Sequence, residues 1–446
     1  MMKKCMGSLV TISLAALVAV AGIMAEEIKE TAMLKITGFA EHSAMREAGA
    51  SIGDIIVTYN GSPVHSIEAL GALKIAVESD VVEAGLLRAG ESITISVPKG
   101  TLGVYLGVIL PDHPRDGDAV VIDGIGKLGW GMNMENSFLG AMYRLDEKFG
   151  DHISYADLSG LSGYAFRVQF FDRWCPSSPD LTCGKNLAPG MFATLGYNGM
   201  SYLLKNEETP PEYDAMARSE DVLRTFIKQS IDRGWPVIAL DLIEVPEWGI
   251  VTGYQKDGGE LFCRSYFDHT ENYDMAVKFP WMIYVMDSHE KKDMSEAYKK
   301  SLELALEMQE TPKYGAYFSG ETAVREWLRA LKAERDLAGM KQERLEEALL
   351  ANWWTMYSLG MARADAASYL RGNRDKFGVT PALIDELARL YEEESDLAKK
   401  AIEVIPSPHV EGAAWTRENR DAQIPIMKEL LKLEKAAHKV LKKAAG

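Results

Sequence analysis

A cysteine and a histidine are the side chains of this sequence best suited to covalent chemistry. Cys175 stands in the unusual tripeptide Trp-Cys-Pro, and His269 directly follows a segment with strand character. A Cys–His pair supports nucleophilic catalysis because the imidazole holds the sulfur as a thiolate and later returns its proton. His152 is a second candidate for the base. The ordinary alternatives are half of a disulfide for the cysteine and a solvated loop position for either histidine.

The spacing of the cysteines favours the disulfide. Cys175 and Cys183 bracket the stretch WCPSSPDLTC, and the oxidising compartment of an exported protein would link them. Cys263 lies in a predicted inner strand and is expected to be a buried hydrophobe. The eight histidines are scattered, without an HExxH motif or pairs at ligand spacing. The sequence therefore predicts no metal site, and it indicates no cofactor.

Export is predicted from the N-terminus. The basic start Met-Met-Lys-Lys is followed by an apolar run from Leu9 to Met24 and an acceptable cleavage site at Ala25. This pattern predicts a signal peptide over residues 1–25 and a periplasmic or extracellular location. The alternative is an uncleaved inner-membrane anchor formed by residues 9–24, which would be the chain's one membrane contact. The formal net charge of −16 argues against a nucleic-acid partner, because phosphate binding needs clustered Lys and Arg.

The elements that would position these residues centre on a predicted hairpin between Gly234 and Asp268. Its strands are predicted at Pro236–Leu242, Gly249–Tyr254 and Glu260–Tyr266. The turn Asp257-Gly258-Gly259 suits a hairpin because glycine reaches positive φ at little steric cost. Upstream, residues 136–149 are predicted to be a helix, since apolar residues recur on one face.

The phrases SYADLSGLSGYAFR and WPVIALDLIEVPEWGIVTGY resemble the papain-like, C39-type peptidases and the butirosin-biosynthesis-H-like group. The resemblance covers residues 119–290 and implies an α+β domain. In that family a cysteine opens the first helix, a histidine lies in the first hairpin strand and a polar residue orients it. Here Ser137 takes the cysteine position and Glu247, Trp248 or Gly249 the histidine position, while Asp268 fits the orienting position.

An inactive relative is the interpretation that these departures favour. Serine replaces cysteine, no histidine is in place, and residues 119–136 contain no glutamine to donate to an oxyanion. A serine hydroxyl without a base is too weakly acidic to attack. The alternative enzyme, a cysteine peptidase or an amide-forming acyltransferase, would use Cys175 with His269.

The segment GFAEHSAMREAGASIGDIIVTYNGSPVHSIEAL resembles a bacterial PDZ domain, over about residues 28–110. The resemblance implies a small β-barrel that binds the C-terminal carboxylate of a peptide at a glycine-rich loop. Most bacterial members have that loop before the first strand, where this chain has only Lys29–Lys35. Leu102, Gly103 and Val104 look like the missing loop in a permuted position. The alternative is an ordinary glycine turn.

Helical periodicity dominates residues 293–446 and predicts a helical bundle. Helices are expected near 295–309, 321–338, 341–359, 362–373, 380–395 and 420–443. Trp327, Trp353, Trp354 and Tyr357 would either pack in the core or line a groove.

The sequence therefore predicts an exported multidomain α+β protein, with a PDZ-like barrel, a papain-like domain and a helical bundle. The leading function is binding of a peptide or small molecule, without turnover, in a cleft between the hairpin and the 136–149 helix. The competing functions are the enzyme described above and a cell-envelope scaffold that holds partners through the PDZ-like domain.

Overall fold

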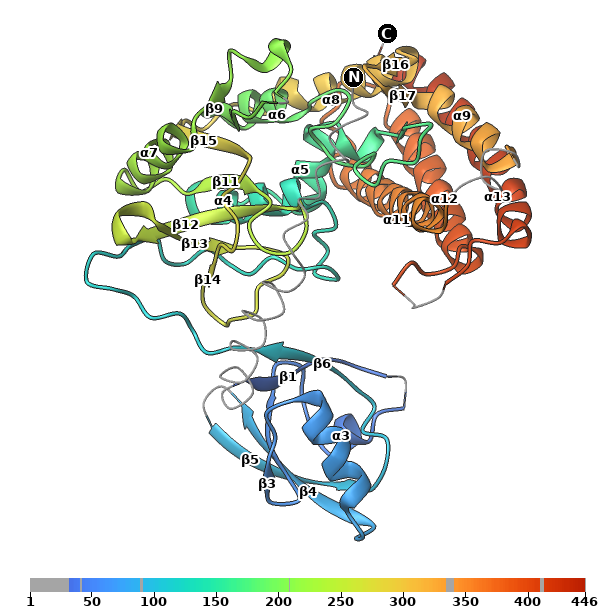
Figure 1. Ribbon diagram of the computed structural model, residues 1–446. Helices are drawn as coiled ribbons and strands as arrows, with labels where there is room; N and C mark the ends of the chain where they lie inside the picture. The colour runs from blue at the N-terminus through green and yellow to red at the C-terminus, as the bar shows by residue number, and fades with distance from the viewer. Residues whose placement is uncertain are drawn as a thin grey trace.

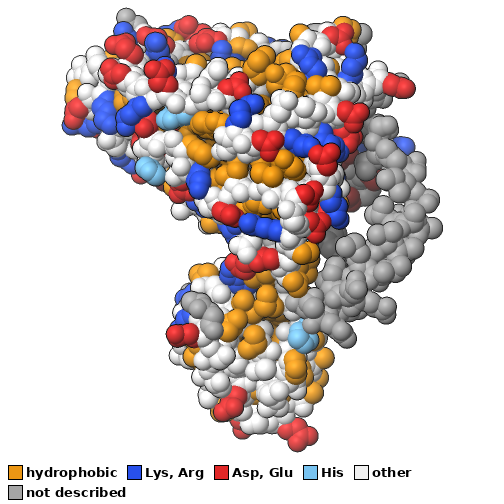
Figure 2. Space-filling model, turned by 90° about the vertical axis from the view of Figure 1, so that its left-hand side faces the viewer, with side chains coloured by type: hydrophobic (Ala, Val, Ile, Leu, Met, Phe, Trp, Pro, Cys, Tyr) orange, Lys and Arg blue, Asp and Glu red, His pale blue; other side chains and the backbone are white. Residues whose placement is uncertain are grey.

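The computed structural model describes residues 32–40, 42–88, 91–207, 209–333, 341–409 and 413–445. The predicted signal peptide and the alternative anchor lie outside these residues. The molecule is a multidomain α+β protein, with a small N-terminal lobe and a larger lobe that holds the remaining elements (Figure 1). The same two lobes are seen in the space-filling view (Figure 2). Within the described ranges, no helix is both long and apolar enough to span a membrane.

The N-terminal lobe is a six-stranded sheet with the strand order β5-β4-β2-β1-β6 and with β3 paired to β2. Its elements are β1 (Met33–Phe39), α2 (Ala44–Glu47), β2 (Ile55–Tyr59), β3 (Ser62–Pro63), α3 (Ile67–Ala76), β4 (Val81–Arg88), β5 (Glu91–Pro98) and β6 (Val104–Ile109). Asn60 and Gly61 form the turn between β2 and β3, with positive φ angles of 52° and 74°. The predicted barrel is wrong for the described residues, because β5 and β6 each pair on one side only and the sheet stays open.

An eight-stranded sheet forms the centre of the larger lobe, with the order β10-β9-β15-β11-β12-β13-β14 and β7 paired to β12. Its strands are β7 (Val120–Val121), β9 (Tyr197–Leu204), β10 (Ala217–Arg218), β11 (Val237–Leu240), β12 (Trp248–Gln255), β13 (Glu260–Arg264), β14 (Asp274–Met275) and β15 (Met282–His289). The predicted hairpin is confirmed as the antiparallel strands β11, β12 and β13. The helices around this sheet are α4 (Ser137–Phe149), α5 (Tyr155–Leu161), α6 (Ala188–Leu195) and α7 (Glu220–Asp232).

The C-terminal region is helical, as predicted, and its long helices lie side by side (Figure 1). They are α8 (Ser295–Glu310), α9 (Gly320–Lys332), α11 (Gln342–Gly372), α12 (Pro381–Val404) and α13 (Arg417–Ala445). A three-stranded sheet made of β16 (Lys313–Tyr314), β17 (Tyr317–Ser319) and β8 (Gln169–Phe170) joins this region to the preceding one.

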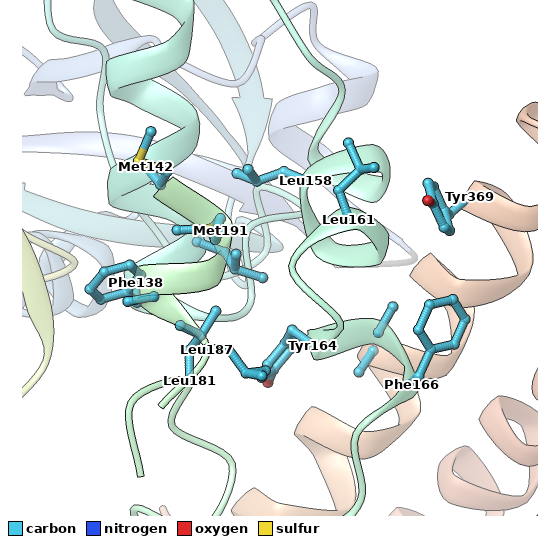
Figure 3. Close-up of a cluster of buried hydrophobic side chains, with 14 of the residues drawn as sticks. Phe138, Met142, Leu158, Leu161, Tyr164, Phe166, Leu181, Leu187, Met191 and Tyr369 are labelled. Carbon is cyan, nitrogen blue, oxygen red and sulfur yellow. The ribbon is translucent and has the colours of Figure 1, made fainter. Parts of the chain in front are cut away.

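One hydrophobic core runs through the central sheet region and the helical region. Phe138 and Met142 of α4 belong to the same buried cluster as Tyr369 of α11 (Figure 3). Arg363 of α11 is fully buried and forms ion pairs with Glu394 of α12 and Glu434 of α13. Its guanidinium also donates to the carbonyl of Ala165, so the two regions share polar as well as apolar contacts.

Candidate functional site

Ser137 and Glu247 meet at the place where the papain-like resemblance puts the nucleophile and its base. Helix α4 begins at Ser137 because the Asn136 side chain accepts a hydrogen bond from the backbone N–H of Leu139 and caps the helix. The Ser137 hydroxyl donates to the Glu247 carboxylate over 2.5 Å, and the Trp248 backbone N–H donates to the same hydroxyl oxygen over 3.3 Å. The hydroxyl is therefore held from two sides.

Burial controls the charge of this pair. It raises the pKa of Glu247 to about 7, and the hydrogen bond from Ser137 opposes that shift while the nearby charge of Asp180 adds to it. Near neutral pH the carboxyl is thus close to half protonated. Ser137 itself is 4% exposed.

Trp248 is a core residue. It is fully buried, packs edge-on against Phe138 at a centroid distance of 4.9 Å, and donates its indole N–H to Asp180 over 2.8 Å. Its ring fills the space between Phe138 of α4 and Tyr284 of β15. A cavity beside the site, lined in part by Tyr164, Pro179 and Ser358, has a volume of only about 20 Å³. That is room for about one water.

Asp268 holds a turn and does not reach the Ser137–Glu247 pair. Its carboxylate accepts from Arg264 over 3.0 Å and from the Ser265 backbone N–H over 2.7 Å. Burial raises its pKa to about 6, and Arg264 opposes that shift. Asp268 stands at the orienting position that the resemblance implies. Its carboxylate, however, contacts Arg264 and Ser265 and does not orient a base.

Cys175 and His269 are not brought together. The Cys175 sulfur lies 3.7 Å from the Tyr317 hydroxyl, whereas His269 pairs with Asp274 and Glu244. His152 is exposed in a loop. The predicted Cys–His site is therefore absent from the described residues, because each side chain has other partners.

The predicted disulfide is also not formed. Cys175 and Cys183 are free thiols, and the thiol of Cys183 lies against the same Tyr317 hydroxyl as that of Cys175. Cys263 is a buried free cysteine, as predicted. Among the described residues, no group of three or more His, Cys, Asp or Glu side chains is arranged to hold a metal ion.

The Leu102–Val104 loop leads directly into β6, an edge strand of the N-terminal sheet. The Leu102 carbonyl accepts from the Met45 N–H and from the Ser43 hydroxyl, both over 3.2 Å, and the Gly103 carbonyl accepts from the Ala40 N–H over 2.9 Å. Gly103 has a φ of +66°, and a Cβ there would lie 2.7 Å from the His42 carbonyl oxygen. Only glycine fits this position.

Of the tryptophans of the helical region, Trp327 takes one of the two predicted alternatives and packs in the core. Trp327 is fully buried and donates to Asn352 over 2.8 Å. Trp353, Trp354 and Tyr357 are half-buried and stacked on one another. Tyr357 donates to Glu135 over 3.2 Å, two residues before Ser137, so this aromatic stack borders the site.

Sequence reasoning missed Asp180 and Arg167, which the fold brings next to the site. Arg167 is buried and donates to the carbonyl of Leu181 over 3.1 Å, in the loop that carries Asp180. The sequence predicted only a disulfide across the stretch WCPSSPDLTC, which gave no signal for these contacts. Comparison with known proteins found no match for this chain, either among protein-family models or among curated proteins.

Proposed function

We propose that the protein binds the C-terminal ends of peptides along β6 of a PDZ-like domain, and that its papain-like domain performs no turnover. The observation that carries the proposal is the way in which the Leu102 and Gly103 carbonyls are tied into the N-terminal lobe. We propose in addition that the protein is exported and that its N-terminal lobe and central sheet region are PDZ-like and papain-like.

The tied carbonyls set the direction of the next two N–H groups. In a trans peptide unit the C=O and the following N–H point in opposite directions. The Gly103 and Val104 N–H groups therefore point away from residues 40–45, toward the unpaired edge of β6. Successive outward N–H groups bind a carboxylate, and an unpaired strand edge accepts an extended peptide.

Absence of turnover is supported by the Ser137 environment. The hydroxyl both donates and accepts a hydrogen bond within the protein, and the base position holds a carboxyl group in place of an imidazole. Ser137 is only 4% exposed, so its hydroxyl presents little surface to a scissile peptide. The pair is best explained as a structural replacement of the Cys–His pair.

Peptide binding is tested by fluorescence anisotropy with the full chain. The probe is a pool of fluorescein-labelled ten-residue peptides whose last four positions are randomised and whose C-terminus is a free carboxylate. The control pool is the same except that the C-terminus is an amide. We expect saturable binding of the acid pool and at least about tenfold weaker binding of the amide pool, since a charge-assisted pair of hydrogen bonds is lost. Equal binding of both pools would refute carboxylate recognition and leave the scaffold function.

A further inference from the structure

The loop from Cys175 to Cys183 has a thiol at each end. Two residues between these thiols contact the neighbours of the Ser137–Glu247 pair. Asp180 accepts from the Trp248 indole over 2.8 Å, and the Pro179 carbonyl accepts a long hydrogen bond of 3.5 Å from the Asn136 side chain. Trp248 and Asn136 flank Glu247 and Ser137 in the sequence. Any movement of this loop therefore reaches both members of the pair.

Both thiols converge on one hydroxyl group. The Cys175 sulfur is 3.7 Å from the Tyr317 Oη, and the Cys183 thiol contacts the same oxygen. Turn hydrogen bonds fold the chain between them: the Ser178 N–H donates to the Cys175 carbonyl over 3.0 Å and the Cys183 N–H to the Asp180 carbonyl over 3.3 Å. Two sulfurs in contact with one oxygen atom lie in the same neighbourhood, and a disulfide requires the loop to bring them to bonding distance.

We propose that Cys175 and Cys183 form a reversible dithiol–disulfide pair whose oxidation moves the 175–183 loop and thereby changes the Ser137–Glu247 site. This device acts in the larger lobe and does not depend on peptide binding by the N-terminal lobe. In the dithiol form described above, Tyr317 contacts both sulfurs. In the disulfide form it loses both contacts, and Asp180, three residues from Cys183, shifts relative to the Trp248 indole.

The oxidant is a small-molecule disulfide, RSSR. The Cys175 thiolate attacks one sulfur of RSSR and expels RS⁻, which leaves a mixed disulfide on Cys175. The Cys183 thiolate then attacks the Cys175 sulfur and expels the second RS⁻. The two protons lost from the cysteines end on the two RS⁻ groups, so two RSH form and two electrons pass from the protein to RSSR.

The order of attack follows from burial. Burial raises the pKa of Cys183 to about 12, although the Tyr317 hydroxyl and the Arg167 guanidinium oppose that shift. Cys183 is therefore a thiol near neutral pH and a slow first nucleophile. Once Cys175 carries the leaving group, the second step is intramolecular and needs only a transient Cys183 thiolate. Reduction by a dithiol reverses both steps.

The covalent step is tested by peptide mapping of the full chain after incubation with oxidised glutathione. We expect one intramolecular link between Cys175 and Cys183, and the reduced protein to regain both alkylatable thiols. Cys183→Ser is expected to stop at a glutathione adduct on Cys175. The matched control is Cys263→Ser, which removes the buried thiol of β13 and is expected to leave the link unchanged. Failure of the link to form, or links between chains only, would overturn the proposal.

The coupling step is tested by hydrogen exchange of the same two forms. We expect altered exchange in segments 136–142 and 247–251 on oxidation. Asp180→Asn, which weakens the contact to the Trp248 indole, is expected to form the disulfide but to reduce the change in segment 247–251. A disulfide without any exchange difference in these segments would show a structural crosslink only and would contradict the proposed control of the site.

Discussion

At the scale of single residues, the Ser137–Glu247 hydrogen bond depends on the protonation of a buried carboxyl. Burial raises the pKa of Glu247 from 4.5 to about 7. The folded protein therefore holds a proton that the unfolded chain loses between these pH values, so the free energy of unfolding falls as the pH rises through this window. At pH 8 the raised pKa of Glu247 lowers the free energy of unfolding by about 3 kcal/mol, compared with a carboxyl whose pKa is unshifted.

Glu247→Gln is expected to flatten this pH dependence. The amide oxygen still accepts from the Ser137 hydroxyl, but the side chain no longer ionises. Relative to wild type, the variant should gain about 2–3 kcal/mol of stability between pH 5 and pH 8. Urea unfolding at several pH values measures this difference. Glu296→Gln, at an exposed position of α8, is the control and should follow the wild-type profile. Parallel profiles for Glu247→Gln and wild type would disprove the assignment.

Ser137 is expected to resist fluorophosphonate probes, which label activated serines. Ser137 is 4% exposed, and its hydroxyl is held by two hydrogen bonds. Mass spectrometry of the full chain after treatment should find no adduct at Ser137, with Ser137→Ala as the blank. Labelling at Ser137 that disappears in Glu247→Gln would instead identify an active Ser–Glu pair and contradict the absence of turnover.

At the scale of elements, α11 connects the central sheet region to the helical region. The sequence predicted two helices, at 341–359 and 362–373, with a break at residues 360–361 between them. The structure has one helix through this point. A Cβ at Gly360 would lie 3.0 Å from the Ala398 Cβ of α12, so this glycine permits close packing of two helices and does not break one.

The contribution of α11 to stability is tested most directly at the buried ion pairs of Arg363. Arg363→Met removes the only cation seen to bond to Glu394 and Glu434 in the described residues and leaves two carboxylates buried. We expect a loss of about 3–5 kcal/mol in the free energy of unfolding. Arg371→Met is the matched control, since Arg371 pairs with Glu392 between the same two helices at an exposed site. It should cost at most about 1 kcal/mol.

A combined variant separates charge from packing. Arg363→Met with Glu394→Leu and Glu434→Met should recover most of the loss, because no buried charge of the triad remains. Equal costs for Arg363→Met and Arg371→Met in urea unfolding would show that the buried triad does not stabilise these helices.

Local signals in the sequence predicted most elements but not their long-range contacts. The Asn60-Gly61 turn, the β11–β13 hairpin and the start of α4 all follow from residues within a few positions. The shared core of α4 and α11 joins residues more than 200 positions apart, such as Phe138 and Tyr369. The site divides in the same way: the resemblance named Ser137 and one of Glu247, Trp248 or Gly249, whereas Asp180 reaches Trp248 only through the tertiary fold.

At the scale of the whole molecule, residues 269–274 of the larger lobe contact both the N-terminal lobe and the segment that links the two lobes. The Leu110 N–H donates to the His269 carbonyl over 2.6 Å, and Lys35 of β1 pairs with Glu271 over 2.5 Å. His113, in the segment that links the lobes, bonds to Asp274 over 2.7 Å. These contacts tie the linking segment and β1 to the turn that follows β13.

The connection between the lobes is expected to weaken as the pH rises. The Asp274 hydrogen bond, followed by the charges of Asp274 and Glu244, raises the pKa of His269 above 6.5. The stabilisation from the imidazolium is complete below the unfolded pKa and is lost as the pH rises through the folded pKa. Hydrogen exchange in segment 110–118, corrected for intrinsic rates, should show more protection at pH 6 than at pH 8.5. His269→Asn should remove much of that difference, and an unchanged difference would rule out His269.

Peptide addition to β6 is the central claim, and hydrogen exchange of the full chain locates it most directly. With a saturating free-acid peptide pool, segment 104–109 is predicted to gain protection, because a bound strand pairs with its outward N–H groups. Val104→Pro, which removes one of these groups at an edge where proline is tolerated, should lose this protection while its unfolding midpoint stays near that of wild type. Protection confined to segments 136–142 and 247–251, or none at all, would contradict the proposed binding along β6.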